Sequence, residues 1–350
     1  MKIAFMSAWN TTSGVCMHSE PIAKAFMEMG HDVKVFTFYP HDYHGDGITA
    51  ENEDFVFPCF GTRFNTNTID PRPFIENDYE ILIVEDLGML PGEKLNNLIP
   101  IIKKKAKVVH VVHENRPPDG TWFYRILWDS IVYFDHRQNF LKKAYPDAEF
   151  IPFPCYKMRT GDKIEARKKL GLPLNKKIVY SFSHRGYGHY YRDLPKELRN
   201  NTILLQVIRE DMHELLEENQ TENPYIIVKR EKVITTQLFD DYLFASDVVI
   251  LHKYQLKDQA VVSTTALQAL GTGCPIFVPK GSDFFQDFKE ALIHYTNPSD
   301  LNSQLITLLN DKSTLIDINK KAEKIIDKFS PDKIAKKFIT LFETLLKNKP

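Results

Sequence analysis

The stretch that decides the fold is ASDVVILHKYQLKDQAVVSTTALQALGTGCPIFVP, residues 245–279. It contains a short apolar run at 248–251, a polar segment, the run STTALQAL at 263–270 that begins with three hydroxyl residues, and a second apolar run at 276–278. Short apolar runs bounded by glycine and proline predict buried strands. The whole stretch therefore predicts a strand, a loop, a helix, a turn that ends in glycine, and a second strand.

The same alternation continues outward in both directions. Further strands are expected where short apolar runs recur: 3–7, 33–38, 81–85, 108–112, 131–134, 178–182, 203–207 and 225–228. Helices are expected where apolar residues repeat at helical spacing: 17–29, 92–105, 235–244, 301–309, 315–329 and 334–346. Continuous apolar strands separated by helices predict parallel sheets covered on both faces. Residues 39–78 are the least regular and are predicted to hold loops or a small inserted hairpin.

The alternation stops at residues 150–162, which contain two prolines and no periodicity, so the linker is placed there. A length of 350 residues also suits two domains. We therefore expect an α/β protein with two doubly wound, Rossmann-like domains facing a cleft. Their predicted bounds are 1–155 and 160–332.

Composition excludes several classes of protein. A net charge of −1 argues against a dedicated nucleic-acid binder, and four widely spaced cysteines without a C-x-x-C pair predict neither a zinc ribbon nor a redox dithiol. No apolar run reaches the ~18–20 residues of a membrane span. The first ten residues fit a strand better than a signal peptide, so a cytoplasmic location is expected.

Charge is unevenly divided between the two halves. Residues 1–155 contain 15 Lys and Arg against 21 Asp and Glu, which leaves 30 and 25 of the chain's 45 and 46 for the remainder. A net positive second half suits an anionic ligand such as a nucleotide diphosphate.

Ligands of open parallel sheets bind beyond the carboxyl ends of the strands, so the loops there are candidate sites. The loop 9–16 follows the first strand, and its Ser13 and Gly14 could present backbone N–H groups to an anion or a sugar hydroxyl. It is not a G-x-G-x-x-G motif, and Gly14 could equally form a tight turn. His113 and Glu114 follow another strand. His113 is either a partner of a sugar hydroxyl or a structural histidine.

Two clusters of like charge in the first half are predicted to be surface features. Glu85 and Asp86 are expected to be solvated or to cap a helix rather than to take part in catalysis. Lysines 103–105 and 107 end the helix expected at 92–105. They could make a weak peripheral contact with anionic lipid, but a solvated helix end is the preferred interpretation.

The second half holds the stronger candidates. Residues 183–192 combine two arginines, Arg185 and Arg192, with two glycines and two histidines just after a predicted strand. One guanidinium group can bind two phosphate oxygens at once, so this segment predicts a diphosphate site. A surface loop is the alternative. Arg230 lies in the charged run 229–232 and could contact base or ribose, although such runs are more often solvated.

Hydroxyl side chains begin the helix expected after residue 262. Ser263, Thr264 and Thr265 could cap this helix and offer N–H groups and hydroxyls to a phosphate. Gln268 lies one turn beyond Thr264 on the same face and could span two ribose hydroxyls.

These residues resemble the signature region of retaining GT-B glycosyltransferases, especially glycosyltransferase family 4. That pattern reads approximately A-D-V-…-E-x-F-G-L-x-x-x-E-A-(M/L)-A-x-G-x-P-V-(I/V), and residues 245–248 and 268–276 match it in type and spacing. The Gly14 loop and the GHDV segment at 30–33 are similar to the family's other half. His113 lies where such enzymes often place a histidine that contacts the sugar, and residues 185–192 resemble their diphosphate-binding pair with altered spacing.

The sequence departs from the family at two positions. The family pattern has two glutamates, and this chain has Ala260 and Gln268 in their places. Gln268 could keep a ribose contact, whereas Ala260 cannot replace a carboxylate. That contact comes from elsewhere, such as Asp258 or Gln259, or is absent.

The resemblance implies a GT-B glycosyltransferase that uses a UDP or GDP sugar, needs no cofactor or metal, and acts on a glycan, lipid-linked or small-molecule acceptor. It implies an acceptor-side domain at 1–155, on which a helix at about 333–350 packs, and a nucleotide-sugar domain at 160–332. His113, Arg185 and Arg192 are the expected catalytic residues. Expected nucleotide contacts are Gly14, Arg185, Arg192, Arg230, Ser263, Thr264, Thr265 and Gln268. Expected sugar or acceptor contacts are Ser13, His113, Glu114 and Gln259.

Two alternatives remain open. Because of Ala260 and Gln268, the chain could be a catalytically silent nucleotide-sugar-binding or scaffold protein. A sugar-nucleotide isomerase of the same architecture is the weaker alternative.

Overall fold

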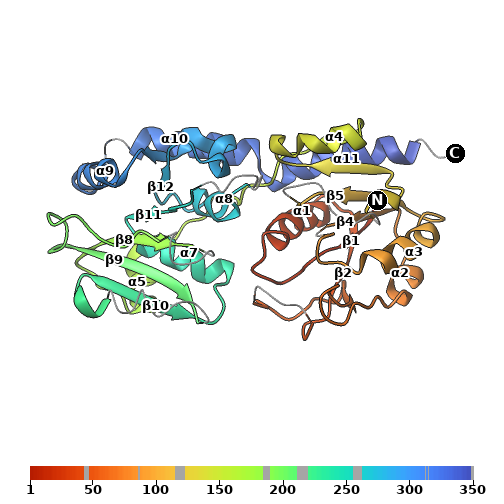
Figure 1. The fold of residues 1–350 in the computed structure, drawn as a ribbon, viewed down its shortest axis with the longest axis horizontal. Helices are drawn as coiled ribbons and strands as arrows, with labels where there is room; N and C mark the ends of the chain where they lie inside the picture. Colours follow the sequence, from red (N-terminus) through yellow and green to blue (C-terminus); the bar gives the residue numbers. More distant parts are fainter. Residues whose placement is uncertain are drawn as a thin grey trace. The chain divides into compact units, whose positions relative to one another are not determined.

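The computed structural model describes residues 1–42, 47–85, 87–114, 123–183, 190–210, 220–254, 262–311, 313 and 315–347. The chain divides into two compact units (Figure 1). Unit 1 contains Met1–Pro154 together with Phe329–Pro350, and unit 2 contains Cys155–Lys257 and Val262–Lys328.

Unit 1 is built on a parallel sheet of seven strands in the order β3-β2-β1-β4-β5-β6-β7. The strands are β1 (Lys2–Met6), β2 (Asp32–Phe38), β3 (Val56–Phe60), β4 (Ile81–Val84), β5 (Lys107–Val111), β6 (Ser130–Tyr133) and β7 (Glu149–Phe150). Its helices are α1 (Cys16–Glu28), α2 (Arg72–Glu76), α3 (Gly92–Ile102), α4 (Leu141–Ala144) and α11 (Pro331–Lys347), with short 3-10 turns η1 (Phe123–Arg125) and η2 (His136–Phe140).

Unit 2 is built on a parallel sheet of six strands in the order β10-β9-β8-β11-β12-β13. These are β8 (Lys177–Phe182), β9 (Thr202–Arg209), β10 (Ile226–Glu231), β11 (Val248–Ile250), β12 (Ile276–Pro279) and β13 (Ile293–Tyr295). The helices are α5 (Lys163–Leu170), α7 (Thr236–Ala245), α8 (Thr264–Leu270), α9 (Pro298–Asn310) and α10 (Leu315–Lys328), and η4 (Asp283–Ala291) is a 3-10 segment.

The local sequence explains where several helices begin. Asp162 accepts a hydrogen bond from Glu165 N at the start of α5, Thr235 does the same for Leu238 N at α7, and Asn297 does so for Asp300 N at α9. A side-chain oxygen at this position satisfies one of the amides that a helix leaves without an internal partner.

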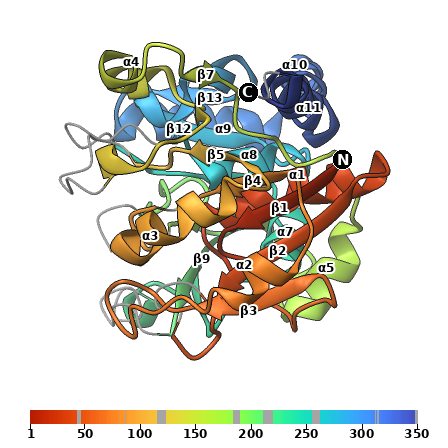
Figure 2. The same cartoon turned by 90° about the vertical axis from the view of Figure 1, so that its right-hand side faces the viewer.

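The sheet of unit 1 is covered on both faces. In the strand order, β2 follows β1 towards one edge of the sheet, and β5 follows β4 towards the other edge. Because both crossovers are right-handed, α1 and α3 lie on opposite faces of the sheet. Figure 2 shows these helices on the two sides of the strands. Helix α11 packs on α1, where the rings of Phe26 and Phe342 lie 5.9 Å apart. Strands β1 and β4 are accordingly buried.

Most predicted strands and helices are present within one to three residues of their expected bounds. Residues 39–78 were predicted to hold loops or a small inserted hairpin, and their described part contains loops and an antiparallel bridge between Phe60 and Ile69. That segment contributes β3, which pairs parallel to β2 at the edge of the sheet, and the short helix α2. Pro58 lies inside β3, and a proline usually argues against a strand unless the strand is at an edge. Strands β7 and β13 were also not predicted, because each has only two or three residues.

Residues 151–162 form neither helix nor strand. All four cysteines are free. None of the helices in the described part of the chain combines the length and hydropathy that a membrane span requires.

The lysines that follow α3 are largely occupied within unit 1. Lys103 Nζ donates to Leu127 O at 2.7 Å and pairs with Asp129 at 3.1 Å, and Lys105 Nζ donates to Ile75 O at 3.0 Å. Helix α3 ends at Ile102, so these lysines lie beyond its last turn rather than within it. These contacts weaken the interpretation of a lipid-binding patch.

Candidate functional site

The topology of each unit indicates where a ligand would bind. In unit 1 the connections diverge from the neighbouring strands β1 and β4, and in unit 2 they diverge from β8 and β11. In open parallel sheets, ligands bind outside the carboxyl ends of the strands at such a switch point.

At the switch point of unit 1, three side chains form what we call the His–Glu–His cluster: His18, Glu85 and His113. Glu85 follows β4 directly, His113 lies just beyond β5, and His18 is on α1. Nδ1 of His18 lies 3.1 Å from each carboxylate oxygen of Glu85, and Nε2 of His113 lies 3.1 Å from Oε2. The side chains of His18 and Glu85 are fully buried, and that of His113 is 11% exposed.

The backbone places these groups. Glu85 N donates to Met6 O, which continues the pairing of β4 with β1, and Val112 N donates to Val132 O, which continues β5 beside β6. The parallel register therefore brings residues 85 and 113 to the same edge of the sheet. The prediction that Glu85 is solvated or capping is wrong, since its carboxylate is buried between two imidazoles. Asp86 lies outside the described residues.

Burial and pairing act in opposite directions on this cluster. Burial alone would raise the pKa of Glu85, but the hydrogen bonds and charge interactions with His18 and His113 outweigh it and bring the pKa to about 2. Burial lowers the pKa of His18, and Glu85 offsets this only in part. The cluster at neutral pH is therefore a buried carboxylate that accepts hydrogen bonds, with His18 neutral.

Aromatic rings enclose the cluster. The ring of His18 lies 5.7 Å from Phe134, 5.1 Å from Phe153 and 6.2 Å from Phe338 of α11. Phe134 also lies 5.1 Å from the ring of His113. An apolar enclosure of this kind strengthens the hydrogen bonds inside it and makes any unpaired polar group there costly.

Gln138 holds the segment that carries His113. Its Nε2 donates to Val112 O at 2.9 Å and to Glu114 O at 3.0 Å, and its Oε1 accepts from the amides of Phe134 and Asp135. The Gln138 side chain is fully buried, so it joins the chain after β5 to the chain after β6. No pattern in the sequence indicated this role for Gln138.

Glu114 lies beside His113. Its Oε1 accepts from Gly88 N at 2.9 Å, whereas its Oε2 is buried and has no hydrogen-bond partner within the described part of the chain. Nδ1 of His113 also makes no hydrogen bond with any described residue. Of this predicted pair, the partly exposed His113 offers a nitrogen that a ligand could use, whereas Oε2 of Glu114 is unpaired but buried.

Ser13 and Gly14 lie at the start of α1. Ser13 is buried, and its Oγ accepts from Cys16 N at 3.2 Å and contacts Thr11 Oγ1 at 3.0 Å. Gly14 is exposed. Ser13 thus organises the loop after β1, while the Gly14 backbone is accessible to solvent.

At the switch point of unit 2, Lys253 and Ser263 lie together. Lys253 follows β11, and its Nζ donates to Ser263 Oγ at 3.3 Å and lies 5.2 Å from the centre of the Phe284 ring. Ser263 caps α8 by accepting from Ala266 N, as predicted, and is fully buried, whereas Thr264 is only partly buried. Thr265 is buried. Lys253 was not recognised from the sequence because a single lysine in a loop carries no pattern.

The arginines that were predicted to bind the nucleotide do not all lie at the switch point of unit 2. Arg192 is exposed in the segment after β8, next to Tyr191, whose N donates to Ser181 Oγ of β8 at 2.8 Å. Arg230 is part of β10, the edge strand two places from β8, and it donates to Glu210 O at 2.8 Å. Arg185 and Gln259 lie outside the described residues.

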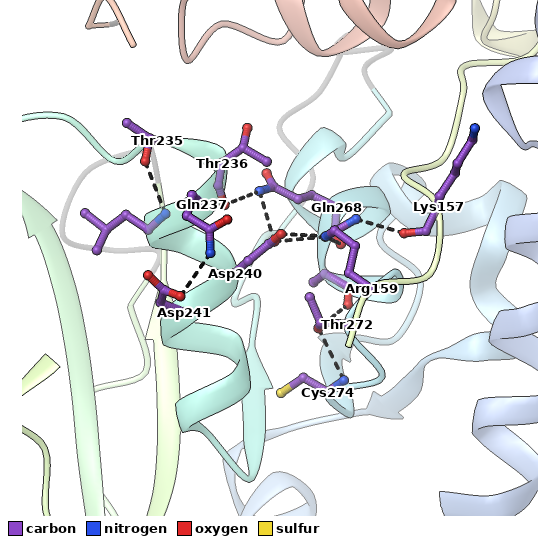
Figure 3. A network of polar contacts seen from close by, with 12 residues as sticks. Lys157, Arg159, Thr235, Thr236, Gln237, Asp240, Asp241, Gln268, Thr272 and Cys274 are labelled. Atoms are coloured by element: carbon purple, nitrogen blue, oxygen red, sulfur yellow. Dashed lines mark hydrogen bonds and ion pairs between the residues drawn. The ribbon is translucent and has the colours of Figure 1, made fainter. Parts of the chain in front are cut away.

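Gln268 belongs to an internal network that Figure 3 shows. Its Nε2 donates to Thr236 O at 3.2 Å and to Asp240 Oδ1 at 3.4 Å, and its side chain is buried. Arg159 completes the network: its guanidinium donates to both oxygens of Asp240, at 2.5 and 2.9 Å, and to Gln268 O at 2.8 Å. Gln268 thus ties α8 to α7 in this structure, and Arg159 ties the segment before α5 to both helices.

The three side chains of the His–Glu–His cluster are also of the types that bind transition metals, and their ligand atoms lie within 4.8 Å of one another. Among the described residues, these three side chains form the group that could hold a metal ion.

No family model matches the chain. Among solved structures, it is similar to the Anabaena protein HepE in complex with UDP-glucose (14% identity, 98% of this chain and 100% of that chain covered, TM-score 0.69). It is also similar to sucrose-phosphate synthase from Thermosynechococcus elongatus (14% identity, both chains fully covered, TM-score 0.66). A third similar structure is WaaG, a glycosyltransferase involved in lipopolysaccharide biosynthesis (14% identity, 97% and 99% covered, TM-score 0.61).

These likenesses extend over whole chains, and the two parallel α/β sheets agree with them. The protein has the GT-B fold, with two Rossmann-like domains, as the sequence predicted. At 14% identity, the similarity shows a shared fold and nothing about the chemistry. The chemistry has to be argued from the residues of this chain.

Proposed function

We propose that this protein is a glycosyltransferase of the family 4 type, which transfers a sugar from a UDP-sugar to a hydroxyl acceptor with retention and without a metal ion. The observation that carries the proposal is the pair His113 and Glu114 at the carboxyl end of β5. Each of them has an acceptor atom without a hydrogen-bond partner among the described residues, and His113 contacts the fully buried carboxylate of Glu85.

Unit 1 would bind the sugar. Sugars present hydroxyl groups that need acceptors, and Nδ1 of His113 and Oε2 of Glu114 are acceptors when the imidazole is neutral and the carboxylate is ionised. Both residues are held in place from the protein side, His113 by Glu85 and Glu114 by Gly88 N and Gln138. Groups held in this way lose little entropy when a ligand binds.

Unit 2 would bind the diphosphate. Lys253 lies beside the start of α8 at the switch point, Arg192 follows β8, and Arg185 lies in the same loop of the sequence. Cationic groups aimed at the departing diphosphate stabilise the charge that grows on it in the transition state, which is the task that a divalent ion performs in other enzymes. The support for a metal-free reaction is thus the supply of Lys and Arg side chains at this position.

Binding of UDP-glucose, UDP and GDP by calorimetry tests the donor half of the proposal. We expect Lys253→Ala to weaken UDP binding and His113→Ala to leave it nearly unchanged while lowering turnover, because His113 is proposed to contact the sugar rather than the nucleotide. Loss of one hydrogen bond to a ligand corresponds to about a tenfold effect. Equal affinity of wild type and Lys253→Ala for UDP would count against the proposed donor site.

A second candidate is a nucleotide-sugar-binding protein without catalytic activity. Two observations favour it: Ala260 stands where the family has a glutamate, and the amide of Gln268 is engaged with Thr236 and Asp240 rather than left for ribose. Release of UDP from UDP-glucose in the presence of a panel of acceptors would exclude this candidate. Binding without any release of UDP would favour it.

The acceptor is proposed as a glycan, a lipid-linked sugar or a small molecule. Of these, a lipid surface has the least support, because Lys103 and Lys105 are bonded to backbone carbonyls of unit 1. A comparison of free and lipid-linked acceptors in the same UDP-release assay separates them.

A further inference from the structure

We propose that Glu85, supported by His18, is a positioning residue that holds His113 with its proton on Nε2, so that Nδ1 accepts a hydrogen bond from a hydroxyl of the bound sugar. The identity of the ligand rests on the proposed function. The position of the proton rests on the His–Glu–His cluster alone.

The hydrogen bonds of the cluster define where the protons are. An ionised carboxylate can only accept hydrogen bonds. Because Nε2 of His113 lies 3.1 Å from Oε2 of Glu85, that nitrogen must carry a proton to form the bond. The same argument places a proton on Nδ1 of His18, which lies 3.1 Å from both oxygens. A neutral His113 then has its lone pair on Nδ1.

The alternative arrangement is unfavourable at this site. If His113 carried its proton on Nδ1, the lone pair of Nε2 would face the lone pairs of a carboxylate that has no solvent exposure. Charges and lone pairs repel strongly when water is excluded. Glu85 therefore selects one of the two neutral forms of His113, and His18 holds Glu85 from the opposite side.

A hydrogen-bonded cluster explains the surroundings better than a metal site does. A histidine that binds a metal usually donates its second ring N–H to a carboxylate, a carbonyl or water. Nε2 of His18 is buried and has no hydrogen-bond partner among the described residues, and the rings of Phe134, Phe153 and Phe338 surround this imidazole. Such an apolar pocket suits a neutral imidazole whose hydrogen bonds within the described chain go to Glu85.

His110 shows what a purely structural histidine looks like in the same strand. It is fully buried on β5, its Nδ1 lies 2.8 Å from Val84 O, and its ring stacks on Trp128 at 4.7 Å. His113 differs because its ring reaches the surface, whereas the second nitrogen of His110, Nε2, is buried and has no hydrogen-bond partner among the described residues. His110 is therefore a matched internal control.

Nitrogen-15 NMR of histidine-labelled protein tests the inference directly, with assignments from His18→Phe, His110→Phe and His113→Phe. In the wild type we expect a proton on Nε2 of His113 and on Nδ1 of both His18 and His110. The imidazole protons of His18 and His113 should exchange slowly with water. A proton on Nδ1 of His113 in the wild type would overturn the inference. The position of the proton is read in the wild-type protein, and the three variants serve only to assign the signals.

The variant Glu85→Leu removes both acceptor oxygens. We expect the slowly exchanging imidazole proton of His113 to disappear while that of His110 remains, and kcat/KM for UDP-glucose to fall about 10- to 100-fold with little change in UDP affinity. Glu85→Asp keeps a carboxylate and should restore part of the activity. Unchanged exchange of the His113 proton in Glu85→Leu would show that Glu85 does not hold it.

Ligand and metal additions complete the experiment. UDP-glucose should shift the Nδ1 signal of His113, and UDP alone should not. Stoichiometric zinc in the purified wild type, with loss of the imidazole proton signals, would overturn the inference in favour of a metal site. If the protons lie as expected but neither UDP-glucose nor UDP binds, the proposed function fails while the positioning of His113 by Glu85 stands.

Discussion

Gly271 offers a sharp test of how the segment before α5 packs. Its φ of −67° suits any residue, so the need for glycine here is one of space. A β-carbon at this position would lie 2.7 Å from Lys157 O, 2.7 Å from Arg159 Nη1 and 3.2 Å from Tyr156 O. Two of these neighbours are backbone carbonyls, which cannot turn aside as a side chain can. We therefore expect Gly271→Ala to destabilise unit 2.

The magnitude follows from the contacts that would have to give way. Relief of the clash moves residues 156–159 away from α8 and stretches the bond from Arg159 N to Gly271 O, now 2.7 Å. Overpacking costs about 1–3 kcal/mol, and a lost hydrogen bond costs about 1 kcal/mol. Alanine recovers about 0.4–1 kcal/mol by restricting the unfolded chain. The net loss of unfolding free energy is about 1–3 kcal/mol.

Gly273 provides the matched control. It lies two residues further along the same turn at a φ of +71°, and a β-carbon there meets nothing within 4 Å. Gly273→Ala should cost about 1 kcal/mol, through backbone strain alone. The double variant of Gly271→Ala with Arg159→Ala should lose less than the sum of the two single variants, because both disturb the same network.

Urea unfolding distinguishes these outcomes. All three tryptophans of the chain lie in the first 128 residues, so their fluorescence reports on unit 1, whereas far-UV circular dichroism reports on both units. We expect Gly271→Ala to lower the dichroism midpoint more than the fluorescence midpoint. A variant as stable as the wild type, or more stable, would refute the packing of residues 156–159 on Gly271.

Three further outcomes are expected. Glu85 has an unfolded pKa near 4.5 and a native pKa of about 2, so the stability it contributes is present above pH 4.5 and is lost as the pH falls towards 2. Glu85→Leu should lack this contribution, while the loss from His18, whose native pKa is also lowered, remains, so the fall in urea midpoint from pH 7 to about pH 3.5 should differ between the wild type and Glu85→Leu. Phe338→Ala should lower the free energy of unfolding by about 3–5 kcal/mol in tryptophan-detected unfolding, because Phe338 of α11 is buried against Phe26 of α1. Ile316→Ala, at an exposed position, should change the free energy of unfolding by less than about 0.5 kcal/mol. Lys253→Ala should weaken UDP binding about tenfold in calorimetry. Lys104→Ala, which removes the same charge from an exposed lysine, is the control. Equal UDP affinities of the two variants would show that Lys253 is not part of the donor site.

The sheets could be predicted because their strands are buried on both faces. Continuous short apolar runs such as 81–84 and 248–250 predict buried strands of a parallel sheet. Glycines and capping residues mark the ends of the helices between them. The edge strand β3 could not be predicted in the same way, since Pro58 interrupts it and an edge position tolerates that interruption.

The site could be predicted only in part. Residues after strand ends, such as His113, Glu114 and Ser263, could be named because parallel topology places all such loops at one edge of a sheet. Glu85 was misjudged because adjacent acidic residues usually lie in water. Gln268 matched a family motif, and only the structure showed its amide bonded to Thr236 and Asp240.

The sequence by itself determined the two α/β units, through the periodicity of apolar residues, which depends on neighbours a few positions apart. The tertiary structure decided the chemistry of the cluster, because His18, Glu85 and His113 are far apart in the chain and meet only through the register of β4 and β5 and the crossover that carries α1. Ionisation and hydrogen bonding depend on distance and on the exclusion of water, and both are properties of the folded chain.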